Sequence, residues 1–519
     1  MDIQASTYLM PDGRLAEILP ESDMEDYFAT FRSNIIGHQQ TFASPFGIKK
    51  IIYADWTASG RLYRPIEAFI QKEIMPFVAN THTETTVTGT LMSKAYEEAK
   101  QIIKQHVNAN GDDALIFCGS GMTAAVNKLQ RLLGLRIPEQ LTAYTKAGSG
   151  LQINERLRPV VFVSRMEHHS NHTSWLETIA TVEIIDNDVN GNVDLAHFRR
   201  LLEQFKHRKN KIAAVTACSN VTGIQTTYHN IAKLIHACGG LCFVDFACSA
   251  PYVDMDMHPG EKDAHLDAVY FSPHKFLGGP GTPGVLIFHK KLYKNTIPDQ
   301  PGGGTVVYSN PWKFHEYTAD IEQREDGGTP PFLQGIKAAM CIRLKEAMGV
   351  ERIQKREEEI LRILFNRLTR MPGVEVLEGN IKKRLGVVSF MVTGAHYNLV
   401  VKILNDRFGI QTRGGCSCAG TYGHHLLKVD KAWSHRILDS VRAGDLHFKP
   451  GWVRLSIHPT MTNAEIDFIM DAIELTAFHI EEWGRDYTYH AVSNEYIFSV
   501  VKEEVGGLIE NWFEVANWC

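Results

Sequence analysis

Short apolar runs flanked by polar turns recur along the chain between residues 112 and 290. Their length and their many β-branched and aromatic residues predict buried strands. The runs lie at 114–118, 159–164, 182–185, 212–217, 241–245, 267–271 and 284–289. Because nearly every position in them is apolar, we expect both faces of the resulting sheet to be covered.

Helical periodicity lies between several of these runs, for example over 122–133 and 229–238. Strands that alternate with helices predict an α/β fold with a mostly parallel sheet. In open sheets of this kind, ligands bind at the carboxyl ends of the strands. Polar side chains at those ends are therefore the first candidates for a functional site.

The pattern changes after residue 300. Residues 301–331 are rich in glycine and proline, which suits a connection near an active site, and 332–371 predicts one long helical stretch. A smaller α+β region follows, with strands near 374–378, 386–392 and 452–457 and helices near 397–407 and 463–483. Residues 424–450 predict a charged, irregular insertion, and the tail after about 487 predicts a helix packed on the smaller region.

Composition narrows the class of protein. Hydrophobic residues make up 44% and charged residues 22%, and 54 basic against 59 acidic residues give a net charge of −5. No basic block marks a nucleic-acid surface, no stretch approaches ~18 uncharged apolar residues, and no leader-like segment opens the chain. Nine cysteines, an odd number, are typical of reduced thiols. We expect a cytoplasmic protein with a small-molecule partner, no nucleic acid and no membrane.

The stretch FSPHKFLGGPGTPG, residues 271–284, places Lys275 in a glycine-rich loop between two predicted strands. In a P-loop the lysine follows the glycines, whereas Lys275 precedes them, so that motif is excluded. A Schiff-base lysine that holds pyridoxal phosphate (PLP) fits the order. On this stretch alone, a surface lysine in a turn is an equal alternative.

Three further stretches follow or end predicted strands. Asp245 ends the run LCFVD and can keep a pyridine nitrogen protonated, although it also suits a turn. The turn within 118–127 opens a helix whose free N–H groups favour a phosphate, but such turns are common. RMEHHSNHTSW, residues 165–175, holds three histidines, one of which can stack on a flat ring. A metal site is the alternative, although no second ligand pair with zinc spacing completes it.

The glycine-rich helix start, the histidines, Asp245 and Lys275 follow one another along the chain. In this order they resemble the motifs of the class V, fold-type-I PLP-dependent enzymes, and most of all those of the group II cysteine desulfurases and selenocysteine lyases. The resemblance covers roughly residues 50–480. It includes IIYADWTASG at 51–60, NTHTETTVTG at 80–89, QREDGGTPP at 323–331 and WVRLSIHPT at 452–460. It implies a large, mostly parallel, seven-stranded-type sheet domain that binds PLP and a smaller α+β C-terminal domain.

The resemblance also implies a role for each matching residue. Lys275 would form the Schiff base, Asp245 would hold the pyridinium, and His168 would stack on the ring. The phosphate would be bound by Gly121, Met122, Thr123, Ser272 and His274. Asn220 would lie near the cofactor oxygen and the substrate carboxylate, Arg454 would grip that carboxylate, and His82 matches an active-site histidine. Thr329 would touch the phosphate of a neighbouring subunit, which implies a homodimer.

RGGCSCAG, residues 413–420, falls where this branch carries its nucleophilic cysteine. Cys418 would attack the sulfur of L-cysteine as a thiolate and keep it as a persulfide, Lys275 would remove the α-proton, and alanine would leave. A sulfur-acceptor protein is then a possible partner. Cys416 and Cys418 would point apart on an extended chain, which disfavours a mutual disulfide. A redox or metal pair, or structural thiols, are the alternatives.

The sequence departs from the family pattern at several positions. Cys248 replaces the usual Gln three residues after the aspartate, so a hydrogen bond to the ring oxygen is lost or is made by another residue. Met122 replaces a Thr, Ser417 replaces a common His, and Cys416 is an additional thiol. The insertion at 424–450 and the tail would shape a different pocket or a partner surface.

Three hypotheses follow. The first is PLP-dependent removal of sulfur or selenium from an amino acid through Cys418. The second is a class V aminotransferase, C–S lyase or epimerase in which Cys418 takes no part in the chemistry. The third is a sulfur- or metal-carrying protein on a degenerate PLP fold, against which the intact Lys275 and Asp245 argue.

The length of 519 residues exceeds what one core usually serves. We divide the chain into an N-terminal segment, 1–50, packed on the small domain; a large PLP-binding domain, 51–331; a small α+β domain, 332–487, that carries the cysteine loop and the 424–450 insertion; and a C-terminal extension, 488–519.

Overall fold

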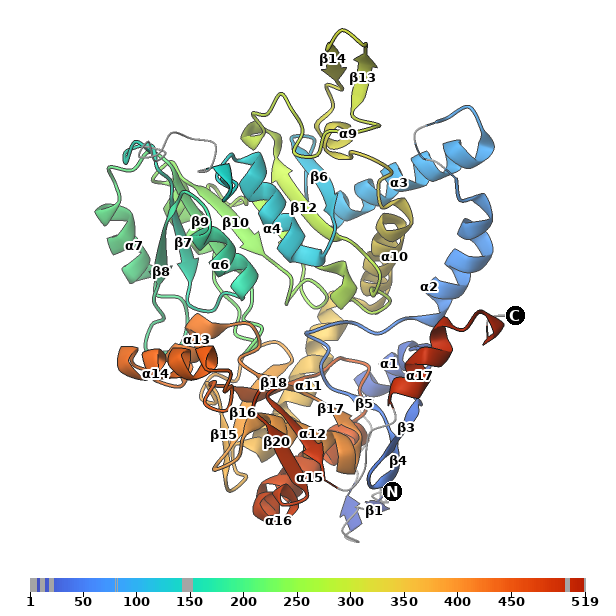
Figure 1. Cartoon of the computed structure of the whole chain (residues 1–519), viewed down its shortest axis with the longest axis vertical. Coiled ribbons are helices and arrows are strands. Elements are labelled where there is room, and N and C mark those ends of the chain that lie inside the picture. Colours follow the sequence, from blue (N-terminus) through green and yellow to red (C-terminus); the bar gives the residue numbers. More distant parts are fainter. Residues whose placement is uncertain are drawn as a thin grey trace.

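The computed structural model describes residues 7–9, 15–17, 23–79, 81, 83–141, 153–499 and 505–517. A central sheet with helices on both faces forms the larger part, and a second sheet with its own helices lies beneath it in the view of Figure 1. None of the helices in the described ranges combines the length and the hydrophobicity that a bilayer crossing requires.

The central sheet confirms the predicted α/β fold. Its strands are β6 (Asp113–Cys118), β7 (Val160–Ser164), β8 (Thr181–Ile185), β9 (Lys211–Thr216), β10 (Leu241–Asp245), β11 (Ala268–Phe271) and β12 (Gly284–His289). They lie in the order β6-β12-β11-β10-β9-β7-β8, and every pair is parallel except the two that involve β12. The carboxyl ends of the parallel strands therefore meet at one edge.

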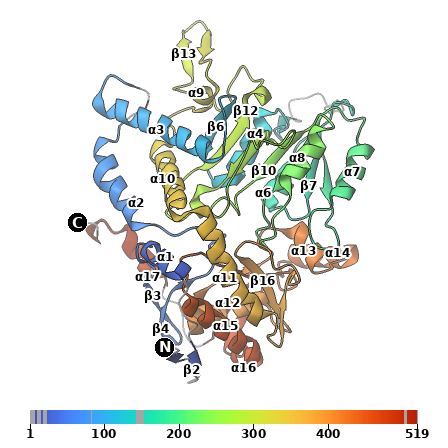
Figure 2. The same cartoon turned by 180° about the vertical axis from the view of Figure 1, so that it is seen from behind.

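Alternate side chains of these strands enter two separate cores. Ile116, for example, packs with α4 (Gly121–Leu132) and α6 (His169–Leu176) on one face. Its neighbour Leu115 belongs to the other core, which contains α3 (Val87–His106), α7 (Leu195–Gln204), α8 (Tyr228–His236) and α10 (Phe332–Met348). Figure 2 shows α7, α8 and α10 from behind. Burial on both faces explains why the strands are apolar throughout.

The second sheet is antiparallel and carries the cysteine loop. Its order is β15 (Val374–Val376), β16 (Val387–Val392), β19 (Trp452–Ser456) and β18 (Arg413–Gly415). The helices α11 (Val350–Leu368), α12 (Tyr397–Phe408), α15 (Asn463–Phe478) and α16 (Ile480–Gly484) accompany it. β17 (Ile410–Gln411) pairs in parallel with β5 (Ile52–Tyr53), so the N-terminal part of the chain joins this half.

The helix α1 (Asp23–Ser33) is also attached to this half. Glu25 accepts a hydrogen bond from the main-chain nitrogen of Asn463 at 2.8 Å and pairs with the buried Arg356 at 3.4 Å. Its own N-terminal turn is acidic, as the helix dipole favours.

Three expectations from the sequence are wrong in detail. The predicted single helix over 332–371 is two helices, because Gly349 lies between α10 and α11 with φ +77°. The insertion at 424–450 is not irregular: α13 (Gly420–Leu426) runs into it and α14 (Lys431–Arg442) forms its centre. Only Ile437 of α14 is buried, so most of this helix faces solvent.

The tail is the third correction. It begins with a hairpin of β20 (Tyr487–His490) and β21 (Glu495–Phe498), whose turn includes Asn494 at φ +57°, and only then continues into α17 (Val505–Phe513). The glycine-rich region 301–331 likewise holds a hairpin, β13 (Val306–Ser309) and β14 (His315–Tyr317), and α9 (Ile321–Glu325). The remaining elements are β1 (Thr7–Leu9), β2 (Leu15–Glu17), β3 (Thr41–Ser44), β4 (Gly47–Lys50), α2 (Arg64–Phe69), η1 (Ile70–Ile74), η2 (Met75–Phe77), η3 (Pro273–Lys275), η4 (Lys290–Leu292) and η5 (Val515–Asn517).

Candidate active site

A cavity of about 200 Å³ lies where the carboxyl ends of the central strands face the second sheet. Its lining includes the predicted site residues Met122, Thr123, His168, Asn220, Asp245, Ser272, His274, Lys275, Cys418 and Arg454. Gly121 begins α4 directly beside it. Two predicted residues are not among them: His82 lies outside the described residues, and Thr329 is exposed on the loop between α9 and α10.

Lys275 ends the short helix η3, immediately after β11. Gly60 approaches this turn closely: its N–H donates to the carbonyl of His274 at 2.9 Å, and a Cβ on Gly60 would lie 1.9 Å from the carbonyl oxygen of Phe276. This contact explains the glycine of IIYADWTASG. Burial lowers the pKa of Lys275, and Cys248 and Asp245 oppose that shift only in part. A lowered pKa increases the fraction of neutral amine, which is the nucleophilic form.

Asp245 ends β10 next to Lys275 in the lining of the cavity. Burial raises the pKa of its carboxyl to about 6, although the N–H of Ala247, which donates to Oδ1 at 2.8 Å, and the charge of Lys275 both favour ionisation. A buried carboxylate of this kind is stabilised further by a cationic partner. The Asp245 carboxylate can therefore accept a hydrogen bond from a protonated ring nitrogen.

The start of α4 forms a pocket suited to a phosphate. Gly121 has φ +62°, and a Cβ there would lie 2.7 Å from Cε1 of His274 and 2.9 Å from Oγ of Ser272. Only glycine therefore lets these two side chains reach the helix start, where the N–H of Met122 donates to Oγ of Ser272 at 2.8 Å. Thr123 adds a hydroxyl, which contacts Ser170 at 2.6 Å. Main-chain N–H groups supply much of the hydrogen bonding that a phosphate needs here. The Met122 side chain, in place of the family's Thr, therefore removes only one hydroxyl donor from the site.

The three histidines of 165–175 have different surroundings. His168 lines the cavity, and its Nδ1 accepts from the main-chain nitrogen of Ser170 at 3.1 Å at the start of α6. Burial, and to a smaller extent the positive charge of Lys275, lowers the pKa of His168 to about 3, so the ring is neutral. Because Nδ1 accepts a hydrogen bond, the single proton of the ring lies on Nε2. A neutral ring suits stacking on a flat ligand.

His169 and His172 instead hold the cysteine loop. The main-chain N–H of His169 donates to the carbonyl of Cys418 at 2.7 Å, and its Nε2 accepts from the N–H of Gly420 at 2.9 Å. Nδ1 of His172 lies 3.1 Å from the hydroxyl of Thr421. In the described part of the chain these histidines form no group close enough to share one ion.

The cysteine loop turns sharply between β18 and α13. Ser417 and Cys418 have φ of +51° and +56°, so the extended chain assumed from the sequence is wrong here. Asn220 donates from Nδ2 to the carbonyl of Ser417 at 2.7 Å, and the indole N–H of Trp452 donates to its Oγ at 3.2 Å. As a result Cys418 lines the cavity, whereas Cys416 packs against the core of the second sheet.

Arg454, from β19, is buried and already paired. Its guanidinium donates to Oδ1 of Asp55 at 2.5 Å and to the carbonyl of Asn220 at 3.2 Å, while Arg413 lies 3.9 Å from Oδ2 of Asp55. Asp55 was missed in the sequence, although it belongs to the quoted stretch IIYADWTASG and follows a buried strand. Since the carboxylate of Asp55 is already paired with the Arg454 guanidinium, a substrate carboxylate would have to compete with Asp55 for it.

Glu167 is a second residue that the sequence reading missed. It is buried beneath the strand ends and accepts from the N–H of Thr216 at 2.9 Å, from Asn171 at 2.7 Å and from the hydroxyl of Ser164 at 2.5 Å. Burial raises the pKa of its carboxyl to about 8. Its contacts connect β7, β9 and α6, which positions His168 next to it in the chain.

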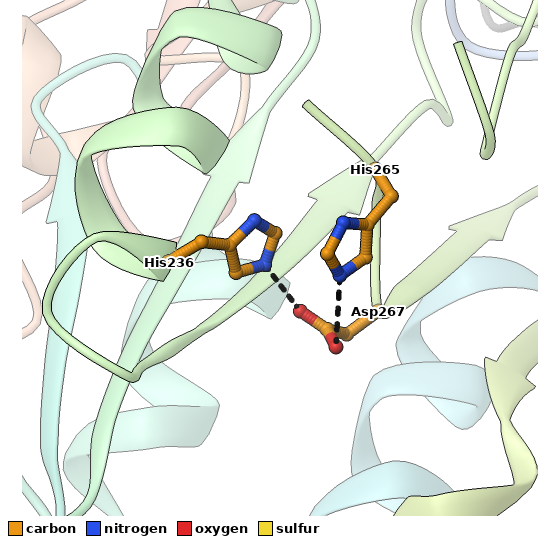
Figure 3. Close-up of side chains that lie close together, drawn as sticks. All are labelled: His236, His265 and Asp267. Carbon is orange, nitrogen blue, oxygen red and sulfur yellow. Dashed lines mark hydrogen bonds and ion pairs between the residues drawn. The ribbon is translucent and has the colours of Figure 1, made fainter. Parts of the chain in front are cut away.

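One group of potential metal ligands lies away from the cavity. Figure 3 shows His236, His265 and Asp267, whose ligand atoms lie within 4.8 Å of one another. Nε2 of His236 is 2.8 Å from Oδ2 of Asp267, its Nδ1 is 2.7 Å from the carbonyl of Asp263, and Lys291 lies 2.7 Å from Oδ1 of Asp267.

This geometry fits an ion-pair network better than a metal centre. Both nitrogens of His236 face acceptors and its pKa is raised, so a protonated ring has no lone pair to offer. The rings of His236 and His265 are stacked at 4.0 Å with an angle of 9°, and parallel rings cannot aim their lone pairs at one ion. Lys291 already neutralises the carboxylate.

Comparison with known proteins agrees with the fold. The family model described as "Aminotransferase class-V" matches residues 52–469. Proteins named "probable cysteine desulfurase" from Staphylococcus aureus and Staphylococcus epidermidis are 26% and 27% identical over 375 residues, which is 72% of this chain and 84% of each relative.

Two solved structures share the fold. A cysteine desulfurase from Thermococcus onnurineus aligns with a TM-score of 0.68 and 23% identity, over 86% of this chain and 98% of that one. A cysteine desulfurase from Escherichia coli aligns with a TM-score of 0.65 and 20% identity, over 87% of this chain and 98% of that one. The match extends across both sheets, so the predicted fold class is confirmed.

Proposed function

Because this chain belongs to the class-V aminotransferase family, we propose that it is a PLP-dependent cysteine desulfurase, which removes sulfur from L-cysteine through a persulfide on Cys418 and releases alanine. The observation that carries this proposal is the shared cavity: Lys275 and Cys418, from opposite halves of the molecule, both line it. The names of the relatives at 26–27% identity support the same reaction.

The cavity fits PLP by the chemistry of its donors. The start of α4 with Ser272 and His274 would hold the phosphate, Lys275 would hold the aldehyde carbon, and Asp245 would hold the ring nitrogen. The cleared space at Gly121 and the unpaired, buried Oδ1 of Asn220 are both consistent with a ligand there. When bound, PLP supplies an electron sink for bonds to the substrate α- and β-carbons.

The chain's own residues would perform the remaining steps. Arg454 would release its ion pair with Asp55 and bind the substrate carboxylate instead, which would fix the orientation of the amino acid. Lys275, with its lowered pKa, would accept the α-proton. The thiolate of Cys418 would attack the substrate sulfur, forming a sulfur–sulfur bond as the carbon–sulfur bond breaks.

The decisive test is turnover of L-cysteine by the PLP-loaded protein with a reductant present. We expect equal amounts of alanine and sulfide from the wild type and from Cys416→Ala, and none from Cys418→Ala. If Cys418→Ala still forms both products, Cys418 is not the nucleophile. If the wild type is inert, another class V reaction such as transamination, β-elimination or epimerisation replaces the proposal.

We further propose that the chain works as a homodimer. The hairpin β13–β14 projects from the top of the molecule in Figure 1 and exposes Tyr308, Trp312 and Phe314, which are 52%, 81% and 56% accessible. Exposed apolar clusters of this kind mark contact surfaces. Thr329 follows the same region and is exposed, so it is available to a partner subunit's phosphate site as the family resemblance implies.

The remaining assignments from the sequence stay proposals of the same kind. We propose a cytoplasmic location, a protein that accepts the persulfide sulfur, and a division of the chain at residues 50, 331 and 487. The division of the chain is supported by the two sheets with separate helices.

A further inference from the structure

Two buried thiols line the active-site cavity in addition to Cys418. Cys218 follows β9 and Cys248 follows β10, and these strands are paired in parallel with Thr216 opposite Asp245. Cys218 lies two residues and Cys248 three residues beyond this last pair of the two strands, so both leave the sheet at the same edge. The N–H of Ala217 donates to the carbonyl of Asp245 at 2.8 Å, so the two strand ends stay together beyond the sheet.

The two side chains point to the same place. The sulfur of Cys218 lies 3.6 Å and that of Cys248 3.7 Å from one carbonyl oxygen, that of Ser219, so both thiols converge on the same point beside the cavity. Both are almost inaccessible to bulk solvent, at 1% and 5%, but both face the cavity through which ligands enter. A small oxidant that enters the cavity therefore reaches them.

Their surroundings give the two thiols different characters. The pKa of Cys248 is lowered, first by the hydrogen bond from Cys218 and then by the charges of Lys275 and Arg454, against the effect of burial. Burial raises the pKa of Cys218. Of the two thiols, Cys248 therefore ionises more readily, and it is the one expected to react first with an oxidant.

We propose that Cys218 and Cys248 form a redox dithiol that a peroxide converts into a disulfide inside the cavity. The Cys248 thiolate attacks one peroxide oxygen, the O–O bond breaks, and a sulfenic acid and hydroxide result. Cys218 gives its proton to that hydroxide and attacks the Cys248 sulfur, and the S–O bond breaks as a second hydroxide leaves and takes up, from solvent, the proton that Cys248 lost on ionising. Two thiols lose two electrons, and hydrogen peroxide becomes two waters. A dithiol reductant reverses the change.

The bridge has a consequence for the site. It consumes the Cys248 thiol, whose negative charge, when the thiol is ionised, opposes the lowering of the Lys275 pKa. We therefore expect the oxidised protein to hold PLP differently from the reduced protein. The chain would then sense peroxide through the pair Cys218 and Cys248, separately from the thiol of Cys418 on the half-buried cysteine loop.

The experiment is oxidation of the full-length protein by hydrogen peroxide, followed by blocking of free thiols and peptide mass mapping without reductant. We expect a peptide pair linked through Cys218 and Cys248 in most molecules, its loss after dithiothreitol, and a change in the visible absorbance of the bound PLP that follows the same time course. Cys248→Ala should show neither the link nor the absorbance change. Cys242→Ala, which alters a buried cysteine at the opposite end of β10, should show both.

Two results would overturn the proposal. One is a wild type in which Cys248 becomes sulfinic acid without any link to Cys218, which would mean that the sulfurs cannot meet. The other is a link between other cysteines with Cys218 and Cys248 left free. Both results are measured as peptide masses of the wild type, so neither depends on whether a variant folds. They are also independent of whether the chain removes sulfur from cysteine.

Discussion

Burial sets the protonation state of the residues around the cavity. Lys275, Asp245 and His168 come from different strand ends, and for each of them removal from water is the largest cause of the pKa shift. Burial disfavours the charged form, so the lysine and the histidine shift down and the aspartate shifts up. The result is an amine whose pKa is lowered, a neutral imidazole ring, and a carboxyl group whose ionised form a nearby cation would stabilise.

The Asp245 shift predicts how PLP retention depends on pH. A protonated ring nitrogen requires ionised Asp245, and the carboxyl takes up its proton as the pH falls through about 6. PLP should therefore dissociate more readily as the pH is lowered from about 8 to about 5. Equilibrium dialysis of PLP across this range measures the effect.

Asp245→Asn provides the control for that titration. The amide cannot ionise, so the variant should bind PLP more weakly at every pH and should lack the step near 6. A wild type that retains PLP equally across the range would show that Asp245 does not hold the ring nitrogen.

At the scale of elements, the cysteine loop depends on α6. Its two left-handed residues are held by hydrogen bonds from His169 in α6, from Asn220 in the turn after β9, and from Trp452 in β19. Left-handed φ values in residues other than glycine are costly and persist only where the surroundings impose them. The loop is therefore positioned by its neighbours and not by its own sequence.

His169→Ala should loosen the loop. The change leaves the N–H of Gly420 without its acceptor, a loss of about 1 kcal/mol. Alkylation of Cys418, followed by peptide mass, should become several times faster. His169→Gln, which offers another acceptor, should restore much of the protection.

His172→Ala is the matched control for this loop. Its partner, the hydroxyl of Thr421, can turn to water, so alkylation should change less than in His169→Ala. Equal alkylation rates in the wild type and in His169→Ala would show that this hydrogen bond does not hold Cys418.

At the scale of the whole molecule, the cavity exists because two halves of the chain meet. Lys275 and Asp245 belong to the central sheet, whereas Arg454 and Cys418 belong to the second sheet, more than 140 residues later in the sequence. Asp55, from the N-terminal part, bridges the arginines of the second sheet. Any change in how the halves pack would therefore separate the proposed base from the proposed nucleophile.

The proposed dimer is tested on the β13–β14 hairpin. Trp312→Asp places a charge on a side chain that is 81% accessible, so the fold should tolerate it while association weakens. Sedimentation velocity of the purified protein measures the change. Trp433→Asp on α14, where the indole is 44% accessible, is the control and should stay dimeric. An unchanged dimer in Trp312→Asp would exclude the hairpin from the interface.

Much of the fold could be predicted from the sequence because it depends on local hydrophobic patterns. The strands of the central sheet are apolar on both faces, and this burial pattern distinguishes them without knowledge of their partners. α14 and the tail hairpin bury few residues, so the continuous apolar runs that reveal the central strands are missing there. Gly349 shows the same limit, because a glycine inside a helical pattern does not reveal a positive φ.

The sequence alone determined the family, the fold class and the order of the candidate residues along the strand ends, since each of these depends on short stretches. Tertiary structure decided the rest. It places Cys418 and not Cys416 in the cavity, pairs Arg454 with Asp55, and uses His169 to hold a loop instead of a cofactor. It also brings the thiols of Cys218 and Cys248 to the same carbonyl oxygen. These contacts join residues far apart in the chain. Their geometry follows from the packing of the two sheets, which no local pattern records.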